Sequence, residues 1–138
     1  MVSYLLDTNH ASRLMANEAS MLARMAEVVQ SDAEFSLSMT VVGELFYAVY
    51  ASQRHLDNRQ RLNRLLNTLR IYSFDQSAAE EFGRIQAEQK AKGRPIPPLD
   101  AQIAAVARSH GLTVLTADKH FEMIDGLRTE NWLAPRSS

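Results

Sequence analysis

Val2-Ser3-Tyr4-Leu5-Leu6 is a short apolar run that stops at Asp7-Thr8-Asn9, three residues that favour turns and helix caps. This order predicts a buried strand that ends directly before a helix. Segments 34–39, 71–74 and 113–116 also have the composition of strands, and a short edge strand is expected within 128–132. The first strand therefore introduces a pattern that recurs along the chain.

Apolar residues at helical spacing lie between these strands, over 19–30, 42–49, 62–69 and 103–107 and around Phe82. Thr40 is the expected N-cap of the helix over 42–49, and Gly93 and Gly111 are the expected ends of two later helices. The proline-dense stretch 94–99 is expected to be a rigid loop. Strands that alternate with helices predict the α/β fold class, with a parallel sheet covered on both faces.

The length of 138 residues and the hydrophobic share of 46% predict a single domain over 1–138 with a sizeable core. The chain has no cysteine, which excludes a disulfide framework and a zinc–thiolate site and suits the cytoplasm. The start, MVSYLLDTNH, lacks the basic region of a signal peptide, and no run approaches the ~20 apolar residues that span a bilayer.

The charge is unevenly distributed, although the formal net charge is only −1. Residues 54–94 hold nine Lys/Arg and five Asp/Glu, a net +4, and the rest of the chain therefore carries −5. A basic middle beside an acidic site would suit a polyanion that approaches a bound metal ion. Ordinary solvated helix faces are the alternative explanation.

Four acidic residues, Asp7, Glu44, Asp100 and Asp118, stand where a strand should end or a helix should begin. Each alone could be a helix cap or a favourable charge in a first helical turn. In a parallel sheet, however, these ends share one edge, so the four carboxylates are expected to converge. Two unit charges ~4 Å apart repel by ~4 kcal/mol at an effective dielectric of 20. A divalent cation would relieve that repulsion, so the sequence predicts a metal site.

Oxygen ligands of this kind suit Mg²⁺, which can contact phosphate oxygens and activate water. The expected chemistry is therefore the hydrolysis of a phosphodiester. Thr8, Asn9 and Thr116 are short polar neighbours that could orient the carboxylates as a second shell. No nucleophile elbow, phosphate-binding loop or dinucleotide fingerprint occurs in the sequence.

The chain resembles a PIN-domain ribonuclease, specifically the VapC-type toxin of bacterial type II toxin–antitoxin systems. The resemblance covers nearly the whole length and rests on short motifs in a specific order. These are Leu5-Leu6-Asp7-Thr8-Asn9, Val42-Gly43-Glu44-Leu45, the segment Ile96 to Ala105 with Asp100, Leu115-Thr116-Ala117-Asp118-Lys119-His120-Phe121, and Gly126 to Trp132.

The resemblance implies a PIN-like three-layer α/β/α fold with strand order 3-2-1-4-5. It implies that Asp7, Glu44, Asp100 and Asp118 hold Mg²⁺ or Mn²⁺ and that the RNA substrate is a transfer RNA or a ribosomal RNA. It further implies a homodimer, inhibited by a cognate antitoxin whose other end binds operator DNA. Apolar residues of the early helices, Leu14, Leu22 and Met25, would meet the antitoxin or else pack in the core.

Two positions depart from the family pattern. Pro97 stands where many relatives have glycine, so the loop before Asp100 is expected to be stiffer. His120 stands where some relatives carry a further acid, so one firmly held ion is expected, with a second arriving with substrate. Both His10 and His120 are expected to be surface or rim residues rather than ligands.

Two other readings use the same residues. A phospho-receiver domain would use Asp7, Asp75, Thr116 and Lys119, but receivers pair two acids after the first strand, and Glu44 would have no role. A PIN fold that binds RNA or protein without cleaving it is the second alternative.

Overall fold

The structure, a computed structural model, describes residues 2–133 and contains a five-stranded sheet in which every neighbouring pair is parallel. The strand order is β3-β2-β1-β4-β5, as the resemblance implied. The expected domain over 1–138 also includes residues 1 and 134–138, which lie outside the described residues. The strands are β1 (Ser3–Leu6), β2 (Glu34–Ser38), β3 (Arg70–Tyr72), β4 (Thr113–Leu115) and β5 (Arg128–Glu130).

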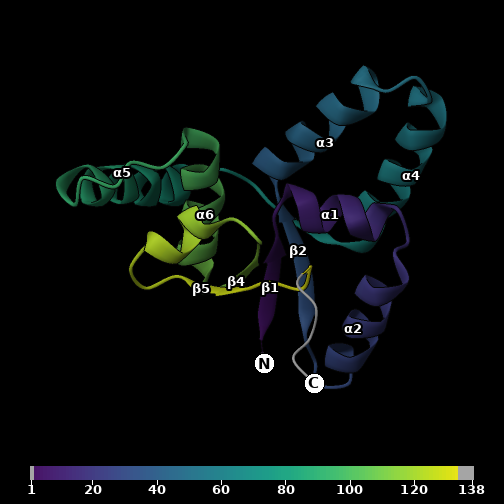
Figure 1. Ribbon diagram of the computed structural model, residues 1–138, viewed down its shortest axis with the longest axis horizontal. Coiled ribbons are helices and arrows are strands. Elements are labelled where there is room, and N and C mark those ends of the chain that lie inside the picture. The colour runs from purple at the N-terminus through teal and green to yellow at the C-terminus, as the bar shows by residue number, and fades with distance from the viewer. Residues whose placement is uncertain (1, 134–138) are drawn as a thin grey trace.

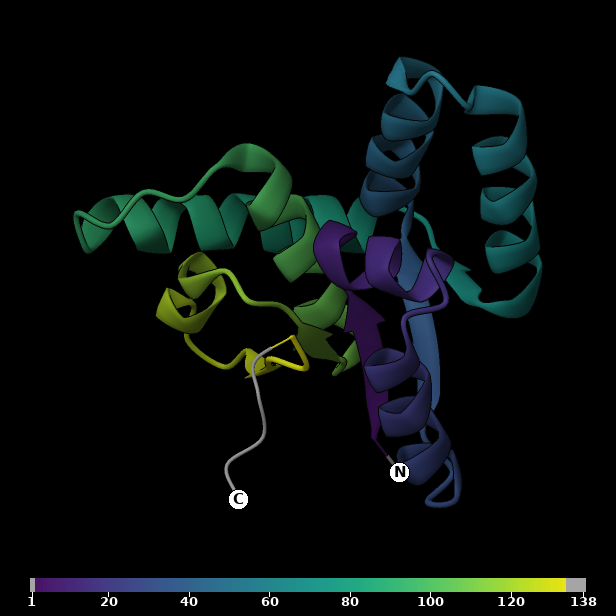
Figure 2. The same cartoon turned by 45° about the vertical axis from the view of Figure 1, so that its right-hand side comes forward.

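Helices cover both faces of this sheet, which gives the expected three layers. Figure 1 shows α5 and α6 on one side of β1 and β2, with α1, α2 and α4 on the other. Figure 2 shows α3 and α4 as a hairpin that projects beyond the sheet. Within residues 2–133, no helix combines the length and the apolar character needed to cross a bilayer. The helices are α1 (Thr8–Met15), α2 (Ala19–Val29), α3 (Met39–Ala51), α4 (His55–Thr68), α5 (Gln76–Ala91), α6 (Pro98–His110) and the 3₁₀ helix η1 (Lys119–Met123).

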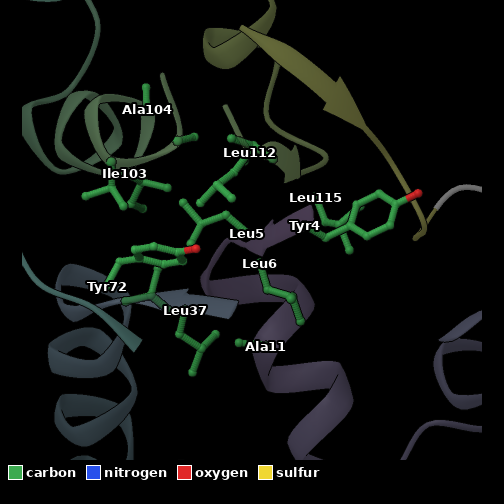
Figure 3. Packing of buried hydrophobic residues seen from close by; sticks show 14 of the residues in the cluster. Tyr4, Leu5, Leu6, Ala11, Leu37, Tyr72, Ile103, Ala104, Leu112 and Leu115 are labelled. Atoms are coloured by element: carbon green, nitrogen blue, oxygen red, sulfur yellow. The ribbon is translucent and has the colours of Figure 1, made fainter. Parts of the chain in front are cut away.

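The core is centred on β1 and its two neighbours. Leu5, Leu6, Leu37 and Leu115 are all fully buried, because their strands are hydrogen-bonded on both sides and covered by both helical layers. Figure 3 shows these side chains in one cluster, with Ala11 of α1 on one side and Ile103 of α6 on the other. The core therefore fixes β1, β2 and β4, the three strands whose ends lead into the acidic residues.

Two local expectations were wrong. Helix α3 begins at Met39, and its N-cap is Ser38, whose hydroxyl accepts a hydrogen bond from the Val41 N–H at 3.3 Å. Thr40 instead donates to Gln102 of α6 at 2.8 Å. Because the helix starts early, Glu44 lies in its second turn and not its first. The preference of the N-terminal dipole for negative charge, which acts on the first turn, therefore does not explain Glu44.

Helix α2 also differs from its expected pattern. Leu22 and Val29, two apolar residues of the segment 19–30 that was expected to have helical apolar spacing, are 42% and 54% exposed, whereas Met21 is buried. The helix thus turns part of its apolar surface away from the core.

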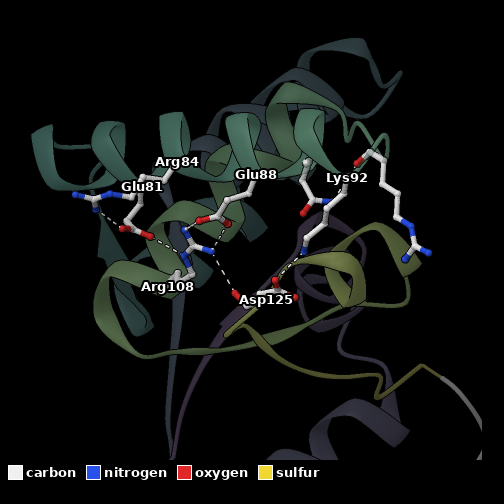
Figure 4. Close-up of polar contacts among 8 residues, drawn as sticks. Glu81, Arg84, Glu88, Lys92, Arg108 and Asp125 are labelled. Atoms are coloured by element: carbon white, nitrogen blue, oxygen red, sulfur yellow. Dashed lines mark hydrogen bonds and ion pairs between the residues drawn. The ribbon is translucent and has the colours of Figure 1, made fainter.

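A polar network joins α5, α6 and the segment before β5 (Figure 4). The Arg108 guanidinium donates to Glu81 at 2.6 Å, to Glu88 at 3.0 Å and to the Asp125 carbonyl at 3.2 Å. Its side chain is only 16% exposed, so these bonds compensate for burying the charge. The hydrogen bonds to Glu88 and Glu81 raise the Arg108 pKa above its ordinary value, although burial opposes that rise. The network holds α6, the helix that carries Asp100, against α5.

Candidate metal centre

One pocket of about 230 Å³ contains all four acids selected from the sequence. It lies where β1 and β4 end and where α6 begins. Thr8 and Asn9, two of the expected neighbours, also line it. The four acidic residues therefore line one pocket, although they are far apart in the sequence. The full lining is Asp7, Thr8, Asn9, Glu44, Asp100, Ile103, Asp118 and Phe121.

Asp7 and Asp118 reach the pocket because each follows a central strand and caps the next helix. Asp7 Oδ1 accepts from the His10 N–H at 2.9 Å and caps α1. Asp118 Oδ1 accepts from the His120 N–H at 2.9 Å and caps η1. Thr116, which was expected in the second shell, accepts from the Asp118 N–H at 3.0 Å. Capping fixes each carboxylate by one oxygen, so it is compatible with a second role for the other oxygen.

Glu44 and Asp100 reach the pocket from helices. The Thr8 hydroxyl donates to Glu44 Oε1 at 2.7 Å, which links the start of α1 to α3. Asp100 lies in the first turn of α6, where the positive end of the helix dipole favours a carboxylate. Pro97, the N-cap of α6, precedes Pro98 at the first helical position. This proline pair leaves the start of α6 little conformational freedom.

The electrostatics of the pocket are unfavourable without a counter-charge. Burial raises the pKa of the Asp100 carboxyl above its ordinary value, and the negative charges of Asp118 and Glu44 raise it further. A hydrogen bond and the charge of His120 oppose that rise. The protein therefore holds a carboxylate where its negative form is disfavoured, which is the environment that a cation would correct.

The donor set fits a divalent cation. One ligand atom each from Asp100, Asp118 and His120 lie within 4.8 Å of one another. His120 Nδ1 lies between the two acids, 3.0 Å from Asp118 Oδ1 and 3.3 Å from Asp100 Oδ2. The nitrogen and the two carboxylate oxygens are therefore close enough to coordinate one cation. Asp7 and Glu44 line the same pocket but do not belong to this tight group.

The basic middle of the chain lies elsewhere. Arg61 and Arg64 of α4 line a different pocket, of about 450 Å³, together with Leu14, Met25 and Leu65. Neither arginine lines the acidic pocket. The expected steering of a polyanion by these residues therefore stays a prediction.

His10 is the functional candidate that the sequence placed wrongly. It is fully buried, not a surface or rim residue, and its Nδ1 lies 2.9 Å from Asp7 Oδ1. The sequence did contain a clue to this contact: His10 follows Asp7 by three residues, and residues i and i+3 share a helix face. His120 does lie at the rim, with a side chain that is 43% exposed.

Comparison with known protein families matches residues 4–127 to the PIN domain. The chain belongs to the PIN domain family. Relatives in this family include the tRNA(fMet)-specific endonuclease VapC of Shigella flexneri, which is 32% identical over 96% of this chain and 99% of its own length. Ribonuclease VapC2 of Haemophilus influenzae is also 32% identical, over 96% of this chain and all of its own length.

Solved structures of VapBC complexes share the fold over nearly all of the chain. A VapBC2 complex from Rickettsia felis, bound to a DNA fragment from its promoter, has a TM-score of 0.88 at 26% identity and covers 95% of this chain and 99% of its counterpart. A DNA-bound VapBC complex from Salmonella typhimurium has a TM-score of 0.86 at 30% identity and covers 96% and 99%.

The phospho-receiver reading is wrong. Receivers have the strand order 2-1-3-4-5, whereas this PIN domain has 3-2-1-4-5. Asp75, the proposed phosphorylation site, follows the edge strand β3 and caps α5 by accepting from the Ala78 N–H at 2.9 Å. It does not line the acidic pocket.

Proposed function

We propose that this protein is a metal-dependent endoribonuclease, the toxin of a type II toxin–antitoxin pair. One observation carries the proposal: Asp7, Glu44, Asp100 and Asp118 line a single pocket at the ends of the central strands. The names of the VapC relatives, a ribonuclease and an endonuclease, support the same class of reaction. The substrate bond is a phosphodiester of RNA, and water is the nucleophile.

The residues have distinct roles in this proposal. Asp7, Asp100 and Asp118 bind Mg²⁺ or Mn²⁺, and Glu44 is either a further ligand or the group that orients the attacking water. Thr8 holds Glu44 in place by its 2.7 Å hydrogen bond. Thr116 holds the backbone that carries Asp118. A divalent cation in this pocket would offset the carboxylate charge and stabilise the charge that develops on the phosphate oxygens.

Transfer RNA is the first substrate to test. The Shigella flexneri relative is named for initiator transfer RNA, and so is a relative from Salmonella typhimurium that is 31% identical. Translation arrest in the cytoplasm would follow from cleavage of either a transfer RNA or a ribosomal RNA. Sequencing of RNA ends from cells that express the chain would identify the target and the bond cleaved.

The deciding experiment incubates the purified chain, free of antitoxin, with total RNA and Mg²⁺ or Mn²⁺. Asp7→Ala and Asp100→Ala should abolish cleavage and relieve growth arrest while the circular dichroism spectrum stays unchanged. Asp57→Asn is the matched control, because Asp57 is an exposed acid in the first turn of α4, outside the pocket. Equal activity of the parent and Asp7→Ala would contradict the proposal and would favour a PIN fold that binds without cleaving.

The proposed antitoxin contact is the pocket between α1, α2 and α4. Its lining combines apolar Leu14 and Met25 with Arg61 and Arg64, a surface that suits an amphipathic segment with acidic residues. Leu22, named with them from the sequence, is exposed on α2 but does not line this pocket. The similar VapBC complexes, both bound to DNA, support an antitoxin partner that also binds operator DNA. Co-purification with the protein encoded by the neighbouring gene, abolished in Met25→Glu, would test this contact.

A homodimer is the proposed assembly of the toxin itself. The projecting α3–α4 hairpin exposes large apolar side chains, with Tyr47 at 76%, Leu56 at 69% and Tyr50 at 58% exposure. Such a patch favours association between copies. Light scattering should give the mass of a dimer for the parent and of a monomer for Tyr47→Glu.

A further inference from the structure

A buried histidine stands directly behind one of the proposed metal ligands. His10 is fully buried in the first turn of α1, and its ring is one helical turn from the N-cap Asp7. Asp7 Oδ1 receives two contacts from this residue, the backbone N–H at 2.9 Å and ring Nδ1 at 2.9 Å. The bond from the backbone N–H is the one that caps the helix, so the ring contact is additional to capping.

The other ring nitrogen fixes the direction of these hydrogen bonds. His10 Nε2 accepts from the backbone N–H of Trp132 at 3.1 Å. A nitrogen that accepts from an N–H group carries no proton, so the ring proton of the neutral imidazole is on Nδ1 and is donated to Asp7. The hydrogen-bond network therefore assigns a single tautomer.

Trp132 is itself held firmly, which makes it a fixed donor. Its indole ring packs against Tyr4 at 5.1 Å and Phe35 at 5.7 Å between ring centroids. Its ring N–H donates to Glu130 of β5 at 3.0 Å. The segment after β5 is thus anchored to β1 and β2, and its backbone reaches the ring of His10.

The consequence falls on the two oxygens of Asp7. Both contacts from His10 use Oδ1, and no described residue donates a hydrogen bond to Oδ2. The carboxylate cannot rotate about its bond to Cβ without breaking the ring contact. An apolar side chain would fill this buried site without the cost of burying a polar ring, so packing alone does not account for a histidine here.

We propose that His10 is a positioning residue for Asp7. With its tautomer set by Trp132, it holds Oδ1 and leaves Oδ2 for a divalent cation. This inference rests on the proposed function, because it takes Asp7 to be a metal ligand. Partners that orient a ligand in this way typically change metal affinity by about 10- to 100-fold when removed.

The test measures Mn²⁺ binding to the full chain by calorimetry, without RNA. The amide nitrogen of His10→Asn can replace Nδ1 and keep a donor for Asp7, whereas His10→Gln places its amide near Nε2 and loses that donor. We expect Mn²⁺ affinity to fall about 10-fold in His10→Gln and by less than about 3-fold in His10→Asn. Equal losses in the two variants, or none in His10→Gln, would overturn the proposal.

A double-mutant cycle shows whether His10 acts through Asp7. In an Asp7→Asn background, His10→Gln should cause no further loss of Mn²⁺ affinity, and a full additional loss would overturn the proposal. Nitrogen-15 NMR of the unaltered chain supplies a readout that does not depend on variant folding: His10 should carry its proton on Nδ1, and a proton on Nε2 would refute the assignment.

The outcomes also separate this proposal from the nuclease itself. If the unaltered chain binds Mn²⁺, and His10→Gln and His10→Asn lose affinity as expected, but RNA is not cleaved, then the role of His10 is supported and the proposed nuclease activity is rejected. If the unaltered chain cleaves RNA and His10→Gln binds Mn²⁺ as tightly as the unaltered chain does, only the proposed role of His10 is rejected. A parent that binds no Mn²⁺ would overturn both.

Discussion

The Thr8 hydroxyl donates a 2.7 Å hydrogen bond to Glu44, so the first residue of α1 holds an acid that comes from the second turn of α3. Thr8→Val keeps the shape of the side chain and removes the donor. We expect RNA cleavage to fall about 10-fold or more, because Glu44 loses its orientation, with a stability loss of about 1 kcal/mol. Single-turnover cleavage rates and urea unfolding measure the two effects. Thr8→Ser keeps the hydroxyl and should retain most of the activity. Full activity of Thr8→Val would show that the Thr8 hydroxyl has no role in the site.

The raised pKa of Asp100 predicts a pH-dependent stability for the metal-free protein. Burial, together with the charges of Asp118 and Glu44, makes the folded state bind this proton more tightly than the unfolded state. The contribution of Asp100 to the free energy of unfolding is therefore largest below its ordinary pKa of 3.8. That contribution is lost as the pH rises through the raised folded-state value.

Asp100→Asn lacks this titration, so its stability relative to the parent should increase as the pH rises through the same window. The measurement is urea unfolding in chelator from about pH 4 to about pH 7, the range over which a raised carboxyl pKa acts. In excess Mn²⁺ the parent should become more stable to urea than Asp100→Asn, because the ion stabilises only the parent. A difference between parent and variant that is independent of pH would contradict the unfavourable charge on Asp100.

The stability of the protein should be sensitive to Arg108, which joins two helices through partly buried ion pairs. Arg108→Ala leaves Glu81 and Glu88 without the guanidinium that joins α5 to α6 (Figure 4). We expect a loss of about 2–3 kcal/mol by urea unfolding, because the side chain is mostly buried. Arg84, which pairs with the same Glu81 but is 60% exposed, is the control, and Arg84→Ala should change stability by less than about 0.5 kcal/mol. Equal losses of stability in the two variants would show that burial does not determine how much these ion pairs contribute to the free energy of unfolding.

Arg61 and Arg64 allow the basic middle of the chain to be tested as an RNA-steering surface. If they neutralise phosphates, the double substitution to alanine should make RNA affinity less dependent on salt. On single-stranded RNA, the logarithmic slope would change by about 0.7 for each phosphate that the protein no longer neutralises. Because both residues line the apolar pocket and not the acidic one, an unchanged slope with weaker antitoxin binding would assign them to the antitoxin alone.

Much of the fold followed from sequence patterns. The five strands, the parallel sheet and the ends of helices at Gly93 and Gly111 agree with expectation, and both glycines have positive φ, where a side chain is strained. The error at α3 arose because Ser38 and Thr40 are both good caps. Which of the two caps α3 depends on where β2 stops pairing with β3, and that tertiary contact cannot be seen in the sequence.

The candidate site could be predicted from the sequence only in part. Asp7, Glu44, Asp100 and Asp118 could be selected because strand ends share one edge of a parallel sheet, and they do line one pocket. Their role in binding metal stays a prediction. His10 was missed because one of its two hydrogen-bond partners is the backbone of Trp132, 122 residues away in the chain, and no local pattern reveals that contact.

The strand order also has a consequence for the synthesis of this protein. Strand β1 emerges first from the ribosome but lies between β2 and β4, and β4 is made only after four-fifths of the chain. Asp118 follows Asp7 by 111 residues (118 − 7), and Trp132 follows His10 by 122, so both pairs can form only after those later residues have been made. A chain that stops before Asp118 lacks one of the four carboxylates that line the acidic pocket.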